Sequence, residues 1–211
     1  MAAGSARPGP LRIALIGIDG AGKSTAARQL AGLLARRGYR VKLRRNAGGR
    51  KWLDNLARRR GSTAEKLLGR RGLSLFETVV RAAALLRTLV RCRPADIEIH
   101  DRYLYCQLAL NRARECPPGR LLRLLGRVIP APGLVLYLDV APERALARVG
   151  SRGTDVESLE DLRAFAAGYR SLADFASFRV IDTNGSPDEI LARVEAALPA
   201  AVRAGGRIAA G

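Results

Sequence analysis

The 211-residue sequence predicts an α/β fold with a five-stranded, mostly parallel sheet flanked by helices. Two observations lead to this prediction. Short apolar runs without alternation recur along the chain, as is typical of strands buried on both faces. Segments with helical spacing separate these runs from one end of the chain to the other. Such alternation favours a single domain in which helices cover both faces of a parallel sheet.

The apolar runs give five expected strands: Leu11–Ile16, Tyr39–Leu43, Ile97–Ile99, Leu134–Asp139 and Arg179–Ile181. Helical spacing predicts helices over Lys23–Arg37, Trp52–Leu68, Leu73–Val90, Leu104–Arg114 and Leu121–Arg127. Later helices are expected to begin near Pro142, Ser158 and Ser186, with Glu189 in a capping-box position. The domain is expected over residues 11–203, between flexible tails at 1–10 and 204–211.

The chain carries 37 Lys and Arg residues against 19 Asp and Glu, a formal net charge of +18. Such a field would attract nucleotides, acidic metabolites or nucleic acid. Only four of these cations are Lys, however, and Ala and Gly are also abundant, which is typical of compositional bias. Nucleic-acid binding, which Arg58-Arg59-Arg60 could serve, is disfavoured by the lack of interleaved aromatic residues.

Several kinds of site are excluded by composition. Cys92, Cys106 and Cys116 form no Cys-x-x-Cys pair and are expected as reduced thiols of a cytoplasmic protein. His100 is the only histidine, so a histidine-based triad or zinc site is not expected. Arginines and prolines interrupt the apolar stretch 121–140, so no membrane span is expected.

The strongest motif lies between the first expected strand and the first helix. It has the pattern G-x-x-x-x-G-K-S and comprises Gly17, Ile18, Asp19, Gly20, Ala21, Gly22, Lys23, Ser24 and Thr25. Glycines let successive backbone N–H groups point at phosphate oxygens, and the helix adds its positive N-terminus. Lys23 would contact the outer phosphates and Ser24 would ligate Mg²⁺. The motif therefore predicts a P-loop NTPase fold that binds a nucleotide with Mg²⁺.

A second motif, Asp101-Arg102, ends the third expected strand. Ligands of parallel sheets bind at the carboxyl ends of the strands, so Asp101 is expected to face the loop that contains Lys23. Its carboxylate can hold Mg²⁺ through water, and Arg102 can bind a substrate phosphate with two N–H groups. Taken alone, the dipeptide could equally be a surface ion pair.

Three segments resemble the thymidylate kinases: residues 17–25, Asp101-Arg102-Tyr103, and residues 136–143 with the arginine-bearing break that follows. The resemblance extends in order over about residues 11–203. It implies the nucleoside-monophosphate kinase fold with a small lid at about 148–158, transfer of the ATP γ-phosphate to dTMP, and a homodimer. By the resemblance, Asp19, Lys23, Ser24 and Asp101 serve ATP and Mg²⁺, and Arg102 holds the acceptor phosphate.

The resemblance also implies roles outside these motifs. Family members without an arginine in the first loop supply one from the lid. Because Ala21 occupies that position here, Arg148 and Arg152 are the candidates to neutralise charge on the transferred phosphoryl group. On the acceptor side, Gln107 matches a base-reading amide. Phe76 resembles a base-stacking ring, with core packing as the alternative.

The acceptor side departs from the family pattern. The family's Arg-Glu-Pro-Gly-Gly-Thr loop reads Arg45-Asn46-Ala47-Gly48-Gly49-Arg50, which keeps Arg45 but lacks the acidic residue and the hydroxyl. Val80 occupies the place of the base-reading arginine, and Arg81, which follows, could read the base or pair with Glu77. Leu110 replaces the tyrosine that guards against a 2′-hydroxyl.

The expected substrate-binding residues are Asp19, Arg45, Phe76, Arg81, Arg102 and Gln107. Because of the departures, a kinase acting on another nucleotide, a nucleoside or a specialised metabolite stays open as an alternative to dTMP. A nucleotide-dependent protein associated with nucleic acid is a further alternative from a different class.

Overall fold

The computed structural model describes residues 9–46, 64–90, 95–151 and 158–205. Its strands are β1 (Leu11–Ile16), β2 (Val41–Arg45), β3 (Ile97–Asp101), β4 (Leu134–Asp139) and β5 (Arg179–Asp182). They pair in the order β2-β3-β1-β4-β5, and every neighbouring pair is parallel. The predicted α/β fold with a parallel five-stranded sheet is thereby confirmed.

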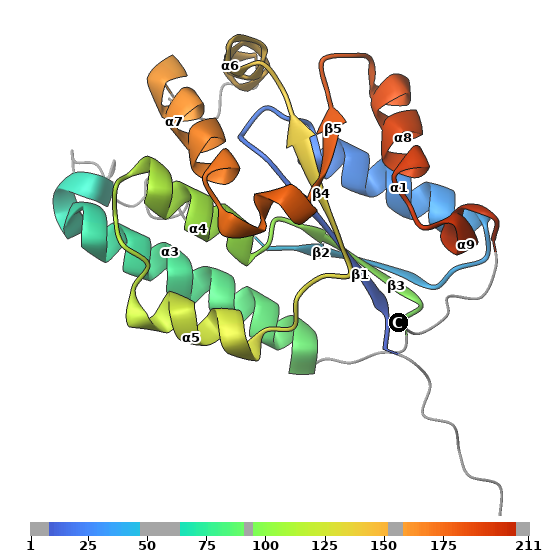
Figure 1. Cartoon of the computed structure of the whole chain (residues 1–211), viewed down its shortest axis with the longest axis horizontal. Coiled ribbons are helices and arrows are strands. Elements are labelled where there is room, and N and C mark those ends of the chain that lie inside the picture. The colour runs from blue at the N-terminus through green and yellow to red at the C-terminus, as the bar shows by residue number, and fades with distance from the viewer. Residues whose placement is uncertain (1–8, 47–63, 91–94, 152–157, 206–211) are drawn as a thin grey trace, which may run out of the picture.

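Helices connect the strands and lie on both sides of the sheet. They are α1 (Lys23–Arg36), α3 (Ala64–Val90), α4 (Leu104–Ala113), α5 (Arg120–Val128), α6 (Pro142–Gly150), α7 (Leu159–Arg170), α8 (Pro187–Ala196) and α9 (Ala200–Arg203), with a 3₁₀ turn, η1 (Ala173–Ser177). In Figure 1, α1 and α8 lie on one side of the strands and α3, α4 and α5 on the other. No helix of the described part of the chain is long and apolar enough to cross a membrane.

Several expected elements differ by one or two residues at their ends, and the second strand and the helix α3 differ for an identifiable structural reason. The second strand starts at Val41 and not at Tyr39, because Gly38 (φ +88°) turns the chain and the Tyr39 N–H donates to Leu34 O at the end of α1. Helix α3 bridges the expected break between residues 68 and 73, with a kink at Gly69 (φ 66°, ψ 169°). The helix expected over 52–68 lies outside the described residues as far as residue 63.

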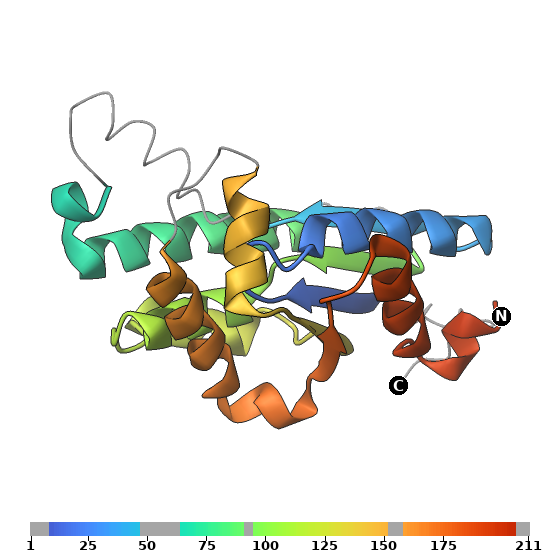
Figure 2. The ribbon, with the colours of Figure 1, turned by 90° about the horizontal axis from the view of Figure 1, so that it is seen from above.

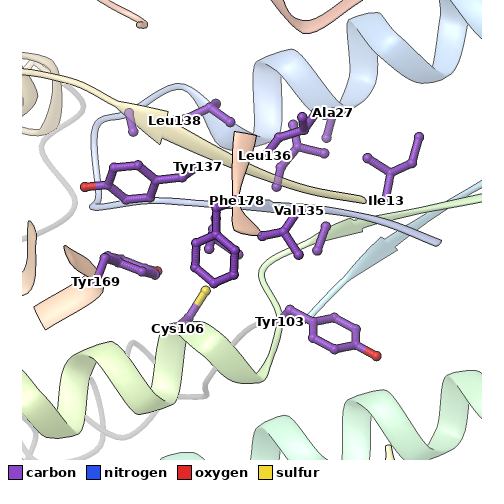
Figure 3. Close-up of a cluster of buried hydrophobic side chains, with 14 of the residues drawn as sticks. Ile13, Ala27, Tyr103, Cys106, Val135, Leu136, Tyr137, Leu138, Tyr169 and Phe178 are labelled. Carbon is purple, nitrogen blue, oxygen red and sulfur yellow. The ribbon is translucent and has the colours of Figure 1, made fainter. Parts of the chain in front are cut away.

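The core lies on both faces of the central strands. In Figure 3, Leu136 and Leu138 of β4 point to the side of Ala27 in α1, whereas Tyr137 points to the opposite side, towards Tyr169 of α7. The Tyr137 and Tyr169 ring centroids are 5.3 Å apart. Each fully buried apolar side chain of this size stabilises the fold by about 1.5–3 kcal/mol. Burial on both faces therefore fixes the strands whose carboxyl ends hold the functional residues.

The expected helix starts at Ser158 and Ser186 are confirmed. Each serine side chain accepts a hydrogen bond from the backbone N–H three residues later, and the acidic side chain at that position accepts a hydrogen bond from the serine backbone N–H. The acidic partners are Asp161 and Glu189. These capping boxes satisfy N–H groups that the first turns of α7 and α8 leave without helical partners.

Candidate active site

The loop between β1 and α1 has a backbone shape that depends on glycine. Gly17 and Gly20 have φ angles of +141° and +83°. A Cβ on Gly20 would lie 2.4 Å from the Ala145 O of α6, and one on Gly17 would lie 2.6 Å from Leu138 O. Helix α6 thus packs directly on the loop, as seen from above in Figure 2. Residues 17–22 form a tight turn at the N-terminus of α1, which is a ready-made site for a phosphate.

Lys23 begins α1 and folds back over this loop. Its Nζ donates to Gly17 O at 2.9 Å and to Ile18 O at 2.6 Å, and it lies 3.6 Å from Asp19 Oδ1. Burial lowers the pKa of Lys23, and the nearby Arg102 lowers it further, while Asp19 opposes both effects. The ammonium group is therefore held inside the loop, within reach of any phosphate bound there.

Asp101 lies at the carboxyl end of β3, where it pairs in register with Leu15 of β1. The Ser24 hydroxyl donates to Asp101 Oδ2 at 2.5 Å. Asp101 Oδ1 is buried and has no hydrogen-bond partner within the described ranges. A hydroxyl beside a carboxylate with an unsatisfied oxygen fits Mg²⁺, which prefers oxygen ligands. The described residues contain no group of three or more His, Cys, Asp and Glu side chains that could hold a metal, so phosphate and water oxygens would supply the other ligands.

Arg102 follows Asp101 and joins the two motifs. Its guanidinium forms an ion pair with Asp19 of the phosphate-binding loop. Burial by itself would lower the pKa of Arg102, but its neighbours, Asp19 foremost, raise it, so the side chain stays charged. The Arg102 backbone has φ +80°, a left-handed conformation that costs a non-glycine residue about 1–2 kcal/mol.

The expected acceptor residues lie on β2, α3 and α4. Arg45 is mostly exposed at the end of β2, with its Nε 4.0 Å from Asp101 Oδ2. Phe76 is half-buried on α3. Arg81 is buried and its Nη1 donates to Asn46 O at 3.3 Å.

Gln107 is completely buried in α4. Its Nε2 donates to Glu77 Oε2 at 3.4 Å and to Asn111 Oδ1 at 3.2 Å. Its Oε1 is buried without a hydrogen-bond partner in the described part of the chain. Glu77 forms its ion pair with Arg114 at 2.9 Å, so the structure does not show the Glu77–Arg81 pair considered from helical spacing.

Arg148 lies in the last turn of α6, beside the phosphate-binding loop. Its Nη1 donates to Gly20 O at 3.4 Å and its Nη2 to Thr183 O at 3.1 Å. Arg152 and the expected lid as far as residue 157 lie outside the described residues. Of the two arginine candidates, Arg148 is therefore the one whose position next to the loop is defined.

Several residues that contact the site were not expected from the sequence. The Tyr169 hydroxyl donates to Gly17 O at 3.3 Å, and burial raises the pKa of Tyr169, which keeps the phenol a donor. Asn111 and Arg114 hold Gln107 and Glu77 as described above. Tyr169 and Arg114 are 152 and 37 positions away from their partners Gly17 and Glu77, so no local signal could have identified them. Asn111 follows Gln107 by four residues on α4, and this helical spacing is a signal that could have identified it.

Comparison with known proteins agrees with this geometry. Residues 16–194 match the family model for thymidylate kinase. A probable thymidylate kinase of Archaeoglobus fulgidus is 32% identical over 180 residues, 84% of this chain and 89% of the relative. Thymidylate kinases of Xanthomonas oryzae pv. oryzae and Xanthomonas euvesicatoria pv. vesicatoria are 32% and 34% identical, each covering 93% of this chain and 86% of the relative. The chain belongs to the thymidylate kinase family and is an ATP-dependent phosphotransferase of the nucleoside-monophosphate kinase type.

Proposed function

We propose that this enzyme transfers the γ-phosphate of ATP to dTMP or a closely related nucleoside monophosphate. The observation that carries the proposal is the ion pair between Arg102 and Asp19. This ion pair holds Arg102, which is suited to bind the acceptor phosphate, against the loop that is suited to bind the donor phosphates. The thymidylate kinases to which the chain is similar support dTMP as the acceptor.

Catalysis of phosphoryl transfer consists mostly of positioning and of stabilising negative charge. Lys23 and the N-terminus of α1 would hold the outer phosphates of ATP, and Arg102 would orient the acceptor phosphate. Arg148, and Arg152 as a second candidate, would stabilise the charge that develops on the transferred group. None of these roles needs a covalent intermediate.

Mg²⁺ would be held by Ser24 and Asp101, with Asp19 as a further carboxylate nearby. The unsatisfied Asp101 Oδ1 supports this assignment because a buried carboxylate oxygen otherwise lacks compensation. When bound, the ion would neutralise charge on the phosphate oxygens.

The contacts of Gln107 support an acceptor whose base is a pyrimidine with an N3–H group. Both of its hydrogen-bonding contacts use Nε2, so the buried Oε1 is left as an acceptor. Thymine and uracil would donate N3–H to this oxygen, whereas cytosine presents a second acceptor there. Phe76, Arg45 and Arg81 would contribute the remaining acceptor contacts.

A coupled assay with a panel of acceptors tests the proposal. The panel would contain dTMP, dUMP, UMP, dCMP, dGMP and thymidine, with ATP and Mg²⁺ held constant. We expect the fastest turnover with dTMP. Turnover of another acceptor without turnover of dTMP would support the second candidate, a P-loop kinase for a different small molecule, which Leu110 favours by replacing the tyrosine of the family.

We also propose a homodimer that forms through α3. Leu75, Val79 and Leu86 are 56%, 48% and 38% exposed and recur at helical spacing on this helix. An exposed apolar stripe of this kind is typical of a protein interface. We propose a cytoplasmic location as well, because Cys106 and Cys116 are free thiols, as a reducing compartment favours.

A further inference from the structure

The backbone conformation of Arg102 is held by neighbouring strands. Arg102 and Glu115 are the two non-glycine residues with a positive φ among the residues described. A side-chain-bearing residue persists in this region only where its surroundings stabilise it. The Arg102 N–H donates to Leu15 O of β1 at 3.1 Å, and the Arg102 carbonyl accepts a hydrogen bond from Asn46 Nδ2 at 2.8 Å.

Asn46 directly follows β2 and is 1% exposed. Its backbone N–H donates to Asp101 O at 3.0 Å, and its side-chain amide donates to Arg102 O. One residue thus binds two successive carbonyl oxygens, on either side of the Arg102 Cα. The Asn46 carbonyl in turn accepts from Arg81, which ties this short segment to α3.

The orientation of the Asn46 amide follows from its partners. A carbonyl oxygen only accepts hydrogen bonds, so the amide atom that faces Arg102 O must be the nitrogen. The same nitrogen lies 3.1 Å from His100 Nδ1, which must then be the unprotonated ring nitrogen that accepts. His100 is 2% exposed, and its Nε2 is directed towards Glu98 Oε2 at 3.8 Å. The acceptor nitrogen of His100 therefore supports this orientation of the amide.

We propose that Asn46 is a positioning residue for phosphoryl transfer. By holding the Arg102 carbonyl, it keeps the Arg102 backbone in the left-handed conformation from which the guanidinium reaches Asp19 and the acceptor phosphate. Without the amide, Arg102 relaxes to a negative φ and its side chain leaves this position. The inference rests on the proposed role of Arg102 in binding the acceptor.

Steady-state kinetics of four variants test this role, with dTMP, or the monophosphate that the panel above turns over fastest, as the acceptor. Asn46→Ala is expected to raise the acceptor KM about tenfold and to leave the ATP KM within about twofold. Asn46→Asp should be impaired similarly, because a carboxylate oxygen cannot donate to Arg102 O. Ile97→Ala, at the other end of β3 and completely buried, is the matched control: it should lower the thermal stability without moving either KM.

An acceptor KM that is unchanged in Asn46→Ala, or an equal rise of both KM values, overturns the inference and leaves the proposed function intact. The fourth variant, Arg102→Ala, separates the two: an unchanged acceptor KM there refutes the acceptor role of Arg102 and the inference with it. A crystal structure of Asn46→Ala gives a readout independent of turnover. We expect a negative φ at Arg102, and a φ that stays near 80° would overturn the inference.

Discussion

Arg102, at the end of β3, and Asp19, in the loop after β1, form an ion pair although 83 positions separate them in the sequence. The pairing of β1 with β3 places the two residues at the same edge of the sheet. The same Asp19 carboxylate lies 3.6 Å from the Lys23 ammonium group. One carboxylate therefore contacts both cations that we propose bind the donor and the acceptor phosphates.

Replacement of Asp19 by Asn should impair both the rate of phosphoryl transfer and the binding of the acceptor. The substitution keeps the side-chain shape but removes the charge that holds Arg102, and a misplacement of about 1 Å can cost about a hundredfold in rate. We expect kcat to fall by about tenfold to a hundredfold and the acceptor KM to rise. Asp96→Asn, which breaks the exposed ion pair with Arg40 before β3, is the control. Equal kinetics for the two variants would contradict the role of Asp19.

Lys23→Ala should abolish most of the stabilisation by nucleotide. A non-hydrolysable ATP analogue with Mg²⁺ at about 100 times its Kd stabilises a protein by about 2.7 kcal/mol. For a domain of this size this corresponds to a rise in Tm of about 5–10 °C. In the variant we expect a shift of at most about 2 °C in a thermal-shift assay. Lys42→Ala, on β2, should respond to the analogue like the wild type; a full shift in Lys23→Ala would contradict the assignment.

The parts of the site that could be predicted from the sequence are those formed by contiguous residues. The glycine and lysine spacing of residues 17–25 and the strand-end position of Asp101 both depend on local order, and the fold places them as expected. Contacts between helices were not predictable. Helical spacing indicated Arg81 as a possible partner of Glu77. In the structure, Arg114, at the end of α4, forms the ion pair with Glu77, and Arg81 donates to the Asn46 carbonyl instead.

Asn46 illustrates the same limit. In the family pattern, the loop after the second strand has an acidic residue at the position of Asn46, so the sequence alone showed only that this acid is absent. In the structure, its amide contacts His100 and the carbonyl of Arg102, both from β3 or the residue after it. Because β2 and β3 pair only through the fold, the sequence around Asn46 contains no sign of these contacts.

Glu98→Gln should weaken the fold at neutral pH and flatten its acid dependence. Glu98 is buried beside Arg12 (3.4 Å) and Arg44 (3.6 Å), and its Oε2 lies 3.8 Å from His100 Nε2. The nearby His100 is the largest influence and lowers the pKa of this carboxyl, burial opposes it, and Arg44 and Arg12 lower the pKa further. A lowered pKa contributes stability that is complete above the unfolded-state value of 4.5 and is lost as the pH falls through the folded-state value. We expect the variant to lose about 1–3 kcal/mol at pH 7, because two partly exposed arginines lose their counter-charge.

Urea unfolding of wild type and Glu98→Gln between about pH 3 and pH 7 measures this effect. The difference in the free energy of unfolding between the two proteins should shrink below about pH 4.5, where Glu98 of the unfolded chain begins to take up a proton while the folded carboxylate stays charged. Two curves that stay parallel down to pH 3 would show that Glu98 contributes nothing through its charge.

A charge on the α3 stripe should convert the proposed dimer to a monomer. Leu75→Glu and Val79→Glu place carboxylates on a surface that a partner copy would bury, where an unpaired charge is strongly unfavourable. Light scattering coupled to size exclusion should then give the monomer mass of 22.7 kDa in place of twice that value. Leu124→Glu, at a 56% exposed position on α5, should leave the mass of the dimer unchanged. A wild-type protein that elutes as a monomer would refute the proposal.

Arg148→Ala should lower kcat with little effect on either KM. The guanidinium already lies beside the phosphate-binding loop through Gly20 O, so it can interact with the transferred group with little rearrangement. Charge stabilisation that operates mainly in the transition state lowers kcat when it is lost, by about a hundredfold or more. Arg144→Ala, an exposed arginine one turn earlier on α6, tests whether loss of any positive charge from this helix is sufficient. If Arg148→Ala retains full kcat while Arg152→Ala loses it, the catalytic arginine is Arg152, and the contacts of Arg148 with Gly20 and Thr183 serve only to hold α6 against the loop.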